Sequence, residues 1–133
     1  MTYPDKFRYT KQHEWIAVDG GVATIGITDY AQQELGDVVF VELPKPGAGV
    51  EAGKTFGSVE SVKAVSEIYA PASGSVVEAN GELHNAPEKI NSDPHGSAWL
   101  IKIKLSDPSQ LDTLMDAAAY NAFIAEKDKD ASA

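Results

Sequence analysis

Apolar and polar residues alternate in several short stretches of the chain, which is the pattern of half-buried β-strands. In residues 99–105, every second residue is apolar and the two lysines between them share the opposite face. Residues 13–18 and 21–27 flank Asp19-Gly20-Gly21, and glycine accepts the positive φ that a tight hairpin turn requires. Further strands are expected at residues 38–43 and 73–80. The pattern therefore predicts a mainly β protein.

Helical signals occur in the N-terminal half of the chain. Residues 28–37 predict a short helix, because Thr28 or Asp29 can cap its first amides and Gly36 can end it in the left-handed conformation.

A second helix is expected near the C terminus, over about residues 109–127, with Asp107 or Ser109 as its cap. Residues 81–98 form a long polar loop, and such loops are usually functional or mobile. Together the elements predict one domain, residues 1–133, built as a small β-barrel or sandwich with two helices.

Charge excludes some classes of function. The chain has 20 acidic and 11 basic residues, a formal net charge of -9, and no cluster of Lys or Arg for a nucleic-acid backbone. No apolar run approaches the ~18 residues that a membrane span needs. The N-terminal residues have no apolar signal core. The expected location is the bacterial cytoplasm, with a mature mitochondrial form left open.

The chain also carries few signs of catalysis. It has no cysteine, hence no thiolate nucleophile or thiolate metal site. His13, His84 and His95 lack metal-ligand spacing, so no metal site is expected and each is interpreted as a surface or loop histidine. No nucleophile elbow or phosphate-binding loop occurs. The sequence is therefore not expected to be that of an enzyme.

One lysine occupies an unusual position. Lys63 lies within residues 56–71, a stretch whose β-branched residues favour extended backbone. If the flanking segments pair as a hairpin, Val62-Lys63 falls at the turn and the amine stands at the tip of a stiff protrusion. A lysine at a turn is usually only a solvated charge. From its position alone, Lys63 is therefore either an ordinary surface lysine or a site of covalent modification.

The sequence GSVESVKAVSEIYAPASGSVVEAN around Lys63 resembles the lysine hairpin of biotinyl and lipoyl carrier domains. A biotin carrier would read M-K-M at the turn and a lipoyl domain of a 2-oxoacid dehydrogenase would read D-K-A. Here VESVKA is similar to the H protein of the glycine cleavage system. The resemblance also takes in HEWI, ATIGITDYAQQELGDVVFVELP, KINSDPHGSAWLIKIKL and the C-terminal LDTLMDAAAYNAFIAE.

The resemblance implies a flattened, lipoyl-like hybrid barrel with a lipoyl-binding core over about residues 22–105. Lys63 would carry lipoate as an amide (N6-lipoyllysine). Glu60, Ser61, Val62 and Ala64 would form the context of the attachment site. The chain would be a non-catalytic carrier, expected to be a monomer. It would take the aminomethyl group of glycine from a pyridoxal-phosphate glycine decarboxylase to an aminomethyltransferase. Dihydrolipoamide dehydrogenase and the lipoate-attaching enzymes would be the other partners.

The same resemblance implies an acidic cleft on the carrier that holds the amine of the loaded arm. Glu14, Glu34 and Glu67 match family positions for that lining. Relatives often have histidine where Glu34 stands and aspartate where Glu67 stands. These departures put the role of Glu34 in particular in question. The alternative for all three is an ordinary solvated surface acid.

Three rival functions stay open at this point. The chain could be a biotin acceptor, an H-like protein that stores or relays lipoate, or an interaction module in which Lys63 is unmodified. The mass added to natively expressed protein distinguishes the first and third of these from a lipoyl carrier.

Overall fold

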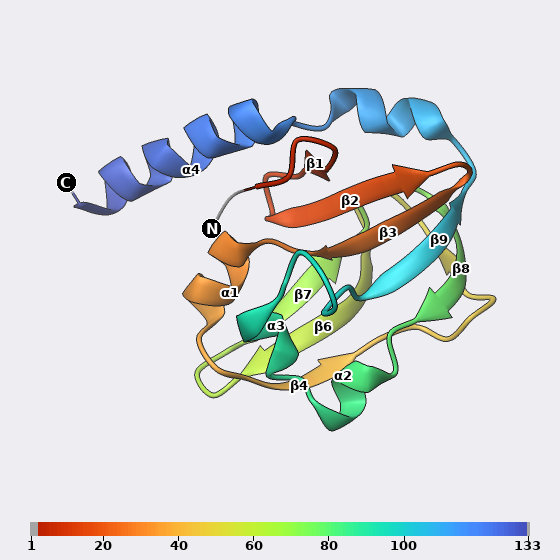
Figure 1. Ribbon diagram of the computed structural model, residues 1–133, viewed down its shortest axis with the longest axis horizontal. Helices are drawn as coiled ribbons and strands as arrows, with labels where there is room; N and C mark the ends of the chain where they lie inside the picture. Colours follow the sequence, from red (N-terminus) through yellow and green to blue (C-terminus); the bar gives the residue numbers. More distant parts are fainter. Residues whose placement is uncertain (1–2, 133) are drawn as a thin grey trace.

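The strands of the computed structural model form two antiparallel sheets in a sandwich-like arrangement (Figure 1). The structure describes the backbone of residues 3–132 and the side chains of residues 3–127. The larger sheet has the order β1-β2-β3-β9-β8-β5 and the smaller has the order β4-β6-β7. The larger comprises β1 (Arg8–Tyr9), β2 (Glu14–Asp19), β3 (Val22–Ile27), β9 (Ile101–Leu105), β8 (Gly74–Ala79) and β5 (Gly49–Val50). The smaller comprises β4 (Val38–Glu42), β6 (Thr55–Ser61) and β7 (Val65–Tyr69). The predicted mainly β class is confirmed.

Local signals in the N-terminal half produce the predicted elements. β2 and β3 pair in register from Glu14↔Ile27 to Asp19↔Val22, around a turn in which Gly20 has a φ of 66°. The helix α1 (Asp29–Leu35) follows, and the side-chain oxygen of Thr28 accepts a hydrogen bond from the Ala31 amide. Gly36, with a φ of 78°, ends the helix. Of the two predicted caps, Thr28 is therefore the one that the structure uses.

The main core lies between the sheets. Ile27 from the larger sheet and Val41, Val59 and Ile68 from the smaller are all buried in one cluster. The segment of residues 81–98, expected to be a loop, contains two short helices, α2 (Glu82–Asn85) and α3 (Lys89–Ser92). Their buried side chains, Leu83 and Ile90, join the same cluster. Burial of these two residues explains why the segment is ordered into helical turns.

The C-terminal region differs from the single helix expected over about residues 109–127. A 3₁₀-helix, η1 (Pro108–Thr113), begins after Asp107, whose carboxylate accepts a hydrogen bond from the Ser109 amide. The helix α4 (Ala117–Ser132) starts separately. Between them Met115 exchanges two backbone hydrogen bonds with Tyr9, of 2.8 and 2.9 Å. This pairing with β1 holds Met115 in extended backbone and so interrupts the helix.

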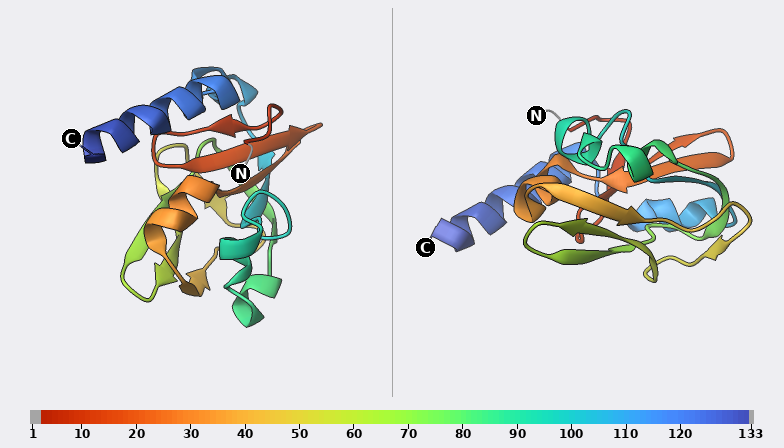
Figure 2. Two further views of the ribbon diagram at one scale, coloured as in Figure 1. Left: turned by 60° about the vertical axis from the view of Figure 1, so that its left-hand side comes forward. Right: turned by 90° about the horizontal axis from the view of Figure 1, so that it is seen from below.

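Aromatic side chains fix α4 to the larger sheet. Tyr120 of α4 is fully buried and stacks on Tyr9, with ring centroids 4.8 Å apart. Beyond this contact, α4 leads away from the sheets towards the C terminus (Figure 2). No helix in residues 3–132 combines the length and apolar character that a membrane crossing requires.

Candidate functional site

A tight turn presents Lys63 at the end of the β6–β7 hairpin. The last strand pair is Glu60↔Val65, and Ser61 then shapes the turn with its backbone and its side chain. Its amide donates to the Ala64 carbonyl at 2.8 Å. Its buried hydroxyl accepts from the Lys63 and Ala64 amides at 3.3 and 3.1 Å and donates to the Ala64 carbonyl at 3.2 Å. Ser61 is therefore a structural determinant of the turn.

The hairpin tip is anchored to the loop between α1 and β4. The Val62 amide donates to the carbonyl of Asp37 at 3.0 Å. That loop is itself held by Asn91 of α3, which donates to the Gly36 carbonyl at 2.8 Å and accepts from the Val38 amide at 2.8 Å. No local pattern in the sequence predicts these contacts of Asn91, because its partners are more than 50 residues away. These hydrogen bonds hold the hairpin tip in place against the loop between α1 and β4.

The amine of Lys63 is available for chemistry. The side chain is exposed, and its Nζ forms no hydrogen bond or ion pair with any residue that the structure describes. Its stem crosses Gly36, where an added Cβ would lie 3.4 Å from Lys63 Cε. A primary amine that is exposed and unpaired, on a rigid turn, fits the attachment of an acyl group.

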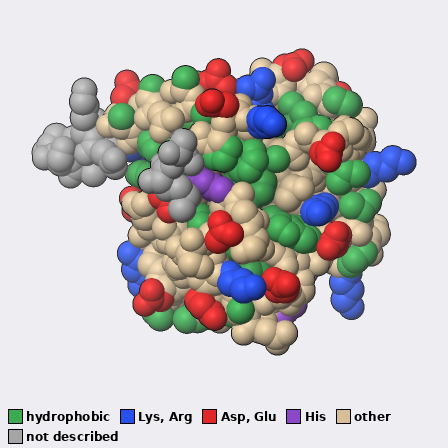
Figure 3. Space-filling model, viewed as in Figure 1, with side chains coloured by type: hydrophobic (Ala, Val, Ile, Leu, Met, Phe, Trp, Pro, Cys, Tyr) green, Lys and Arg blue, Asp and Glu red, His purple; other side chains and the backbone are tan. Residues whose placement is uncertain are grey.

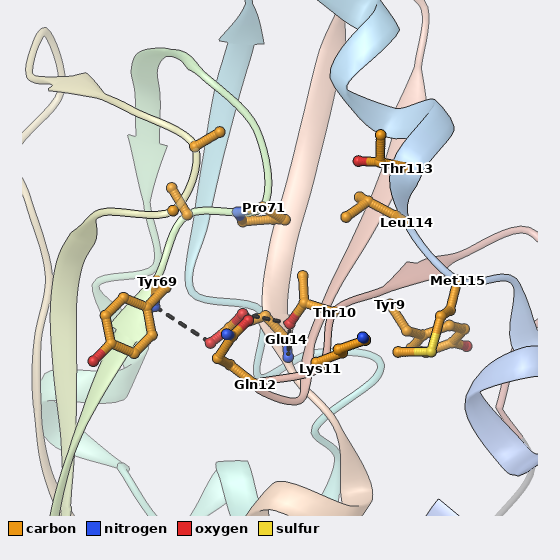
Figure 4. A pocket seen from close by; sticks show the side chains of 13 residues that line it. Tyr9, Thr10, Lys11, Gln12, Glu14, Tyr69, Pro71, Thr113, Leu114 and Met115 are labelled. Carbon is orange, nitrogen blue, oxygen red and sulfur yellow. Dashed lines mark hydrogen bonds between the residues drawn. The ribbon is translucent and has the colours of Figure 1, made fainter. Parts of the chain in front are cut away.

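Glu14 lies in the wall of a cavity of about 520 Å³. Its side chain is 1% exposed and accepts hydrogen bonds from the Thr10 hydroxyl at 2.5 Å and the Tyr69 amide at 3.3 Å (Figure 4). Burial raises the pKa of the Glu14 carboxyl to about 7, although these hydrogen bonds act in the opposite direction. Lys11 and Gln12 line the same cavity. Glu14 is thus a carboxyl that can change its charge near neutral pH.

Glu34 and Glu67, expected in the same cleft, lie elsewhere. Glu34 is exposed and lines a second cavity, of about 420 Å³, together with Ala64, the residue that follows Lys63. Gln12 lines both this cavity and that of Glu14, so the two are neighbours. Glu67 opens into a third hollow, and its carboxylate accepts a hydrogen bond from Thr55 at 3.4 Å. Side chains alternate along β7, and burial of Ile68 turns Glu67 to the outer face.

Two of the histidines have structural contacts that the sequence did not predict. His13 has a φ of 71°, and its Nδ1 lies 2.7 Å from the hydroxyl of Tyr120, which lies 2.7 Å from the Thr28 hydroxyl. Burial, with a smaller effect of Lys127, lowers the pKa of His13 to about 4. The ring of His95 accepts a hydrogen bond from the Asp29 amide at 3.0 Å. Both rings are half-buried, but both residues lie outside the helices and strands, which confirms the interpretation as loop histidines.

Charged side chains of the described residues were compared with the patterns typical of metal and nucleic-acid sites. Within the described residues, no group of three or more His, Asp or Glu side chains is placed to hold a metal ion. On the face drawn in Figure 3, Lys and Arg side chains are scattered among acidic and apolar ones.

Comparisons with known proteins identify the family of the chain. The family model described as glycine cleavage H-protein matches residues 7–127. A glycine cleavage system H protein of Acidobacterium capsulatum is 61% identical over 127 residues, covering 96% of this chain and 98% of the relative. One of Brevibacillus brevis is 56% identical over 126 residues, covering 95% and 100%.

A solved structure supports the same assignment. The crystal structure of a glycine cleavage system H protein from Mycobacterium marinum superposes with a TM-score of 0.83 at 40% identity. The match covers 90% of this chain and 97% of that one. The chain therefore belongs to the glycine cleavage H-protein family.

Proposed function

We propose that this chain is the lipoyl carrier of a glycine cleavage system and that Lys63 is its attachment site. The observation that carries the proposal is the unpaired amine of Lys63 on an anchored hairpin tip, in a member of the H-protein family. Acylation converts an exposed ammonium into a neutral amide, which breaks no ion pair among the described residues. When bound, lipoate supplies a disulfide that can accept the aminomethyl group of glycine and later be regenerated by oxidation.

The chain itself would bind and shield the amine of the loaded arm. Glu14 is the carboxylate best placed for this, because it is buried in a cavity wall and charge-assisted hydrogen bonds gain from desolvation. Such a bond contributes about 1.5–3 kcal/mol. The cation would also favour the ionised form of Glu14, whose pKa of about 7 lets it respond near neutral pH. Glu34, in the neighbouring cavity, is a second candidate, whereas Glu67 faces a separate hollow.

The proposed partners follow from the role of the family within the glycine cleavage system. They are the pyridoxal-phosphate glycine decarboxylase, the aminomethyltransferase and dihydrolipoamide dehydrogenase, together with the enzymes that attach lipoate. The chain would act as their shared mobile substrate and catalyse none of the steps itself. The close relatives reported above are bacterial, which supports a bacterial cytoplasmic location. A lipoate store and a biotin acceptor are the alternatives that an experiment must separate.

Intact-mass measurement of natively expressed protein tests the proposal. The parent should carry the mass of one lipoyl group, and Lys63→Arg should carry none, because arginine keeps the positive charge but cannot be acylated in this way. Lys54→Arg, at another exposed lysine of the same hairpin region, is the matched control and should be modified like the parent. Lipoate on the Lys63→Arg protein, or a biotin mass on the parent, would contradict the assignment.

A second variant tests the position of the amine within the hairpin. Exchanging the two residues, as Lys63→Ala with Ala64→Lys, moves the lysine by one residue while keeping composition and charge. Because successive residues point in different directions, modification should fall sharply while the melting temperature stays close to that of the parent. Equal modification of both proteins would show that the register of the hairpin is not read.

A further inference from the structure

Three hydrogen bonds join Thr10 to Glu14 across the turn between β1 and β2. The Thr10 amide donates to the Glu14 carbonyl at 3.0 Å, and the Glu14 amide donates to the Thr10 hydroxyl oxygen at 3.1 Å. The same hydroxyl donates to Oε1 of the Glu14 carboxyl at 2.5 Å. Thr10 is buried, with 8% of its surface exposed. The turn therefore fixes the two side chains relative to each other.

The chemistry of the donors determines the direction of each hydrogen bond to the Glu14 carboxyl. A backbone amide only donates, so the Thr10 oxygen is the acceptor for the Glu14 amide and its single proton is left for Oε1. The Tyr69 amide likewise donates to Oε2 at 3.3 Å. Thr10 and Tyr69 lie on opposite sides of the carboxyl (Figure 4). Donors on both oxygens favour the ionised form, because a proton on Oε1 would take the place of the one that Thr10 donates.

The two donors differ in how far they depend on the residue type. The donor on Oε2 is a backbone group, which every residue except proline supplies at position 69. The donor on Oε1 is a side chain, and a residue without a hydroxyl at position 10 would remove it. Among the described residues that line the cavity of Glu14, Lys11 is the only other charged one, and Tyr9 and Tyr69 contribute phenols. Thr10 is therefore the side chain through which the sequence controls this carboxyl.

We propose that Thr10 is a positioning residue, whose hydroxyl holds the Glu14 carboxylate in the orientation that receives the amine of the loaded arm, which rests on the role proposed above for Glu14. Each carboxylate oxygen can accept a second hydrogen bond, so an ammonium in the cavity still finds an acceptor. A side chain that is already ordered loses less conformational entropy when the amine arrives. The hydroxyl also offsets part of the cost of burial and so keeps more of the carboxyl ionised at neutral pH.

Ionisation of Glu14 matters because the aminomethyl group is lost through its free amine. Hydrolysis adds one water, breaks the carbon–sulfur bond and releases formaldehyde and ammonia, leaving the arm as a dithiol. The lone pair of the amine assists the departure of the sulfur, and in an ammonium this lone pair is bound to a proton. A neighbouring carboxylate favours the ammonium form. Removal of the Thr10 hydroxyl should therefore shorten the lifetime of the loaded carrier.

The first measurement uses the full-length protein without its lipoyl group, so that it does not depend on the carrier function. The Glu14 carboxyl is titrated by NMR of carboxyl carbons and assigned from the signal that Glu14→Gln lacks. The parent should titrate with a pKa of about 7, and Thr10→Ser, which keeps the hydroxyl, should stay close to it. In Thr10→Val and Thr10→Ala, which lack the hydroxyl, the midpoint should rise by about one pH unit. Thr24→Val removes a partly exposed hydroxyl of β3 outside the cavity lining and, as the matched control, should titrate like the parent.

The second measurement follows the release of formaldehyde from the lipoylated, aminomethyl-loaded protein at pH 7. Thr10→Val should lose the group about fivefold faster than the parent, whereas Thr10→Ser and Thr24→Val should stay within about twofold of it. In a Glu14→Gln background, Thr10→Val should have no further effect, because Thr10 acts through Glu14. A change of packing alone would add its effect in both backgrounds.

The outcomes separate the role of Thr10 from the function of the cavity. Thr10 is not a positioning residue if Thr10→Val and Thr10→Ala titrate like the parent, or if Thr10→Val accelerates the loss equally in the Glu14→Gln background. If Glu14→Gln itself loses the group no faster than the parent, the role proposed for Glu14 fails and that of Thr10 fails with it. Faster loss from Glu14→Gln with no change in Thr10→Val refutes the role of Thr10 alone.

Discussion

Replacing Glu14 with glutamine should remove the pH dependence of stability that this buried carboxyl imposes. In the unfolded chain the Glu14 carboxyl ionises near its ordinary pKa of 4.5, and in the folded protein burial raises that pKa to about 7. Between these values the unfolded state releases its proton first, so the parent loses stability as pH rises from 4.5 through 7. One pKa unit corresponds to about 1.4 kcal/mol, so the loss amounts to roughly 3 kcal/mol of unfolding free energy.

Glutamine resembles the protonated form of Glu14 and does not titrate. Its oxygen can accept the hydrogen bond from the Tyr69 amide, and its amide can donate to the Thr10 hydroxyl oxygen, so packing is retained. The gain in stability of Glu14→Gln over the parent should therefore grow with pH and reach a plateau above pH 8. His13 lowers the stability of both proteins as pH falls from 6.5 towards 4, and this contribution cancels in the difference.

Urea unfolding at pH 5, 6, 7 and 8 measures the effect. Glu88→Gln, which removes an exposed carboxylate, is the control and should follow the parent at every pH. The reasoning is refuted if the difference between Glu14→Gln and the parent is the same at pH 5 and pH 8. In that case the Glu14 carboxyl would ionise as readily in the folded protein as in the unfolded chain. The cavity wall would then carry a full negative charge throughout the physiological pH range.

Two further substitutions test contacts that only the structure shows. Asn91→Ala leaves the Gly36 carbonyl and the Val38 amide without this partner, so the unfolding free energy should fall by about 2 kcal/mol. An unchanged urea midpoint would mean that water replaces both bonds. Tyr120→Phe keeps the stacked ring but removes the hydroxyl that joins His13 to Thr28. The free energy of unfolding should fall by about 1–3 kcal/mol, which a thermal melt detects as a lower melting temperature. A melting temperature equal to that of the parent would show that these hydrogen bonds do not secure α4.

The sequence could predict the elements that depend only on neighbouring residues. The β2–β3 hairpin follows from alternation and from a glycine that accepts a φ of 66°, and α1 follows from Thr28 at one end and Gly36 at the other. Lys63 could be placed at a hairpin turn for the same reason, since strand propensity and a short connection are properties of neighbouring residues. The resemblance of the segment around Lys63 to lipoyl carriers then identified the family, which the comparisons bear out.

Contacts between residues far apart in the sequence determined the features that could not be predicted. The C-terminal helix is interrupted because Met115 pairs with Tyr9, a residue from the other end of the chain. Glu14 and Glu67 were both expected to line one acidic cleft, yet Glu14 is buried in a cavity wall and Glu67 faces outward. Burial depends on which strands cover each face of the sheet. Likewise, Asn91 bonds to Gly36 and Val38, and no pattern among its neighbouring residues indicates these contacts. A sequence determines the conformations that its neighbouring residues favour, whereas burial, and with it the charge that a side chain carries, is determined only when distant segments pack together.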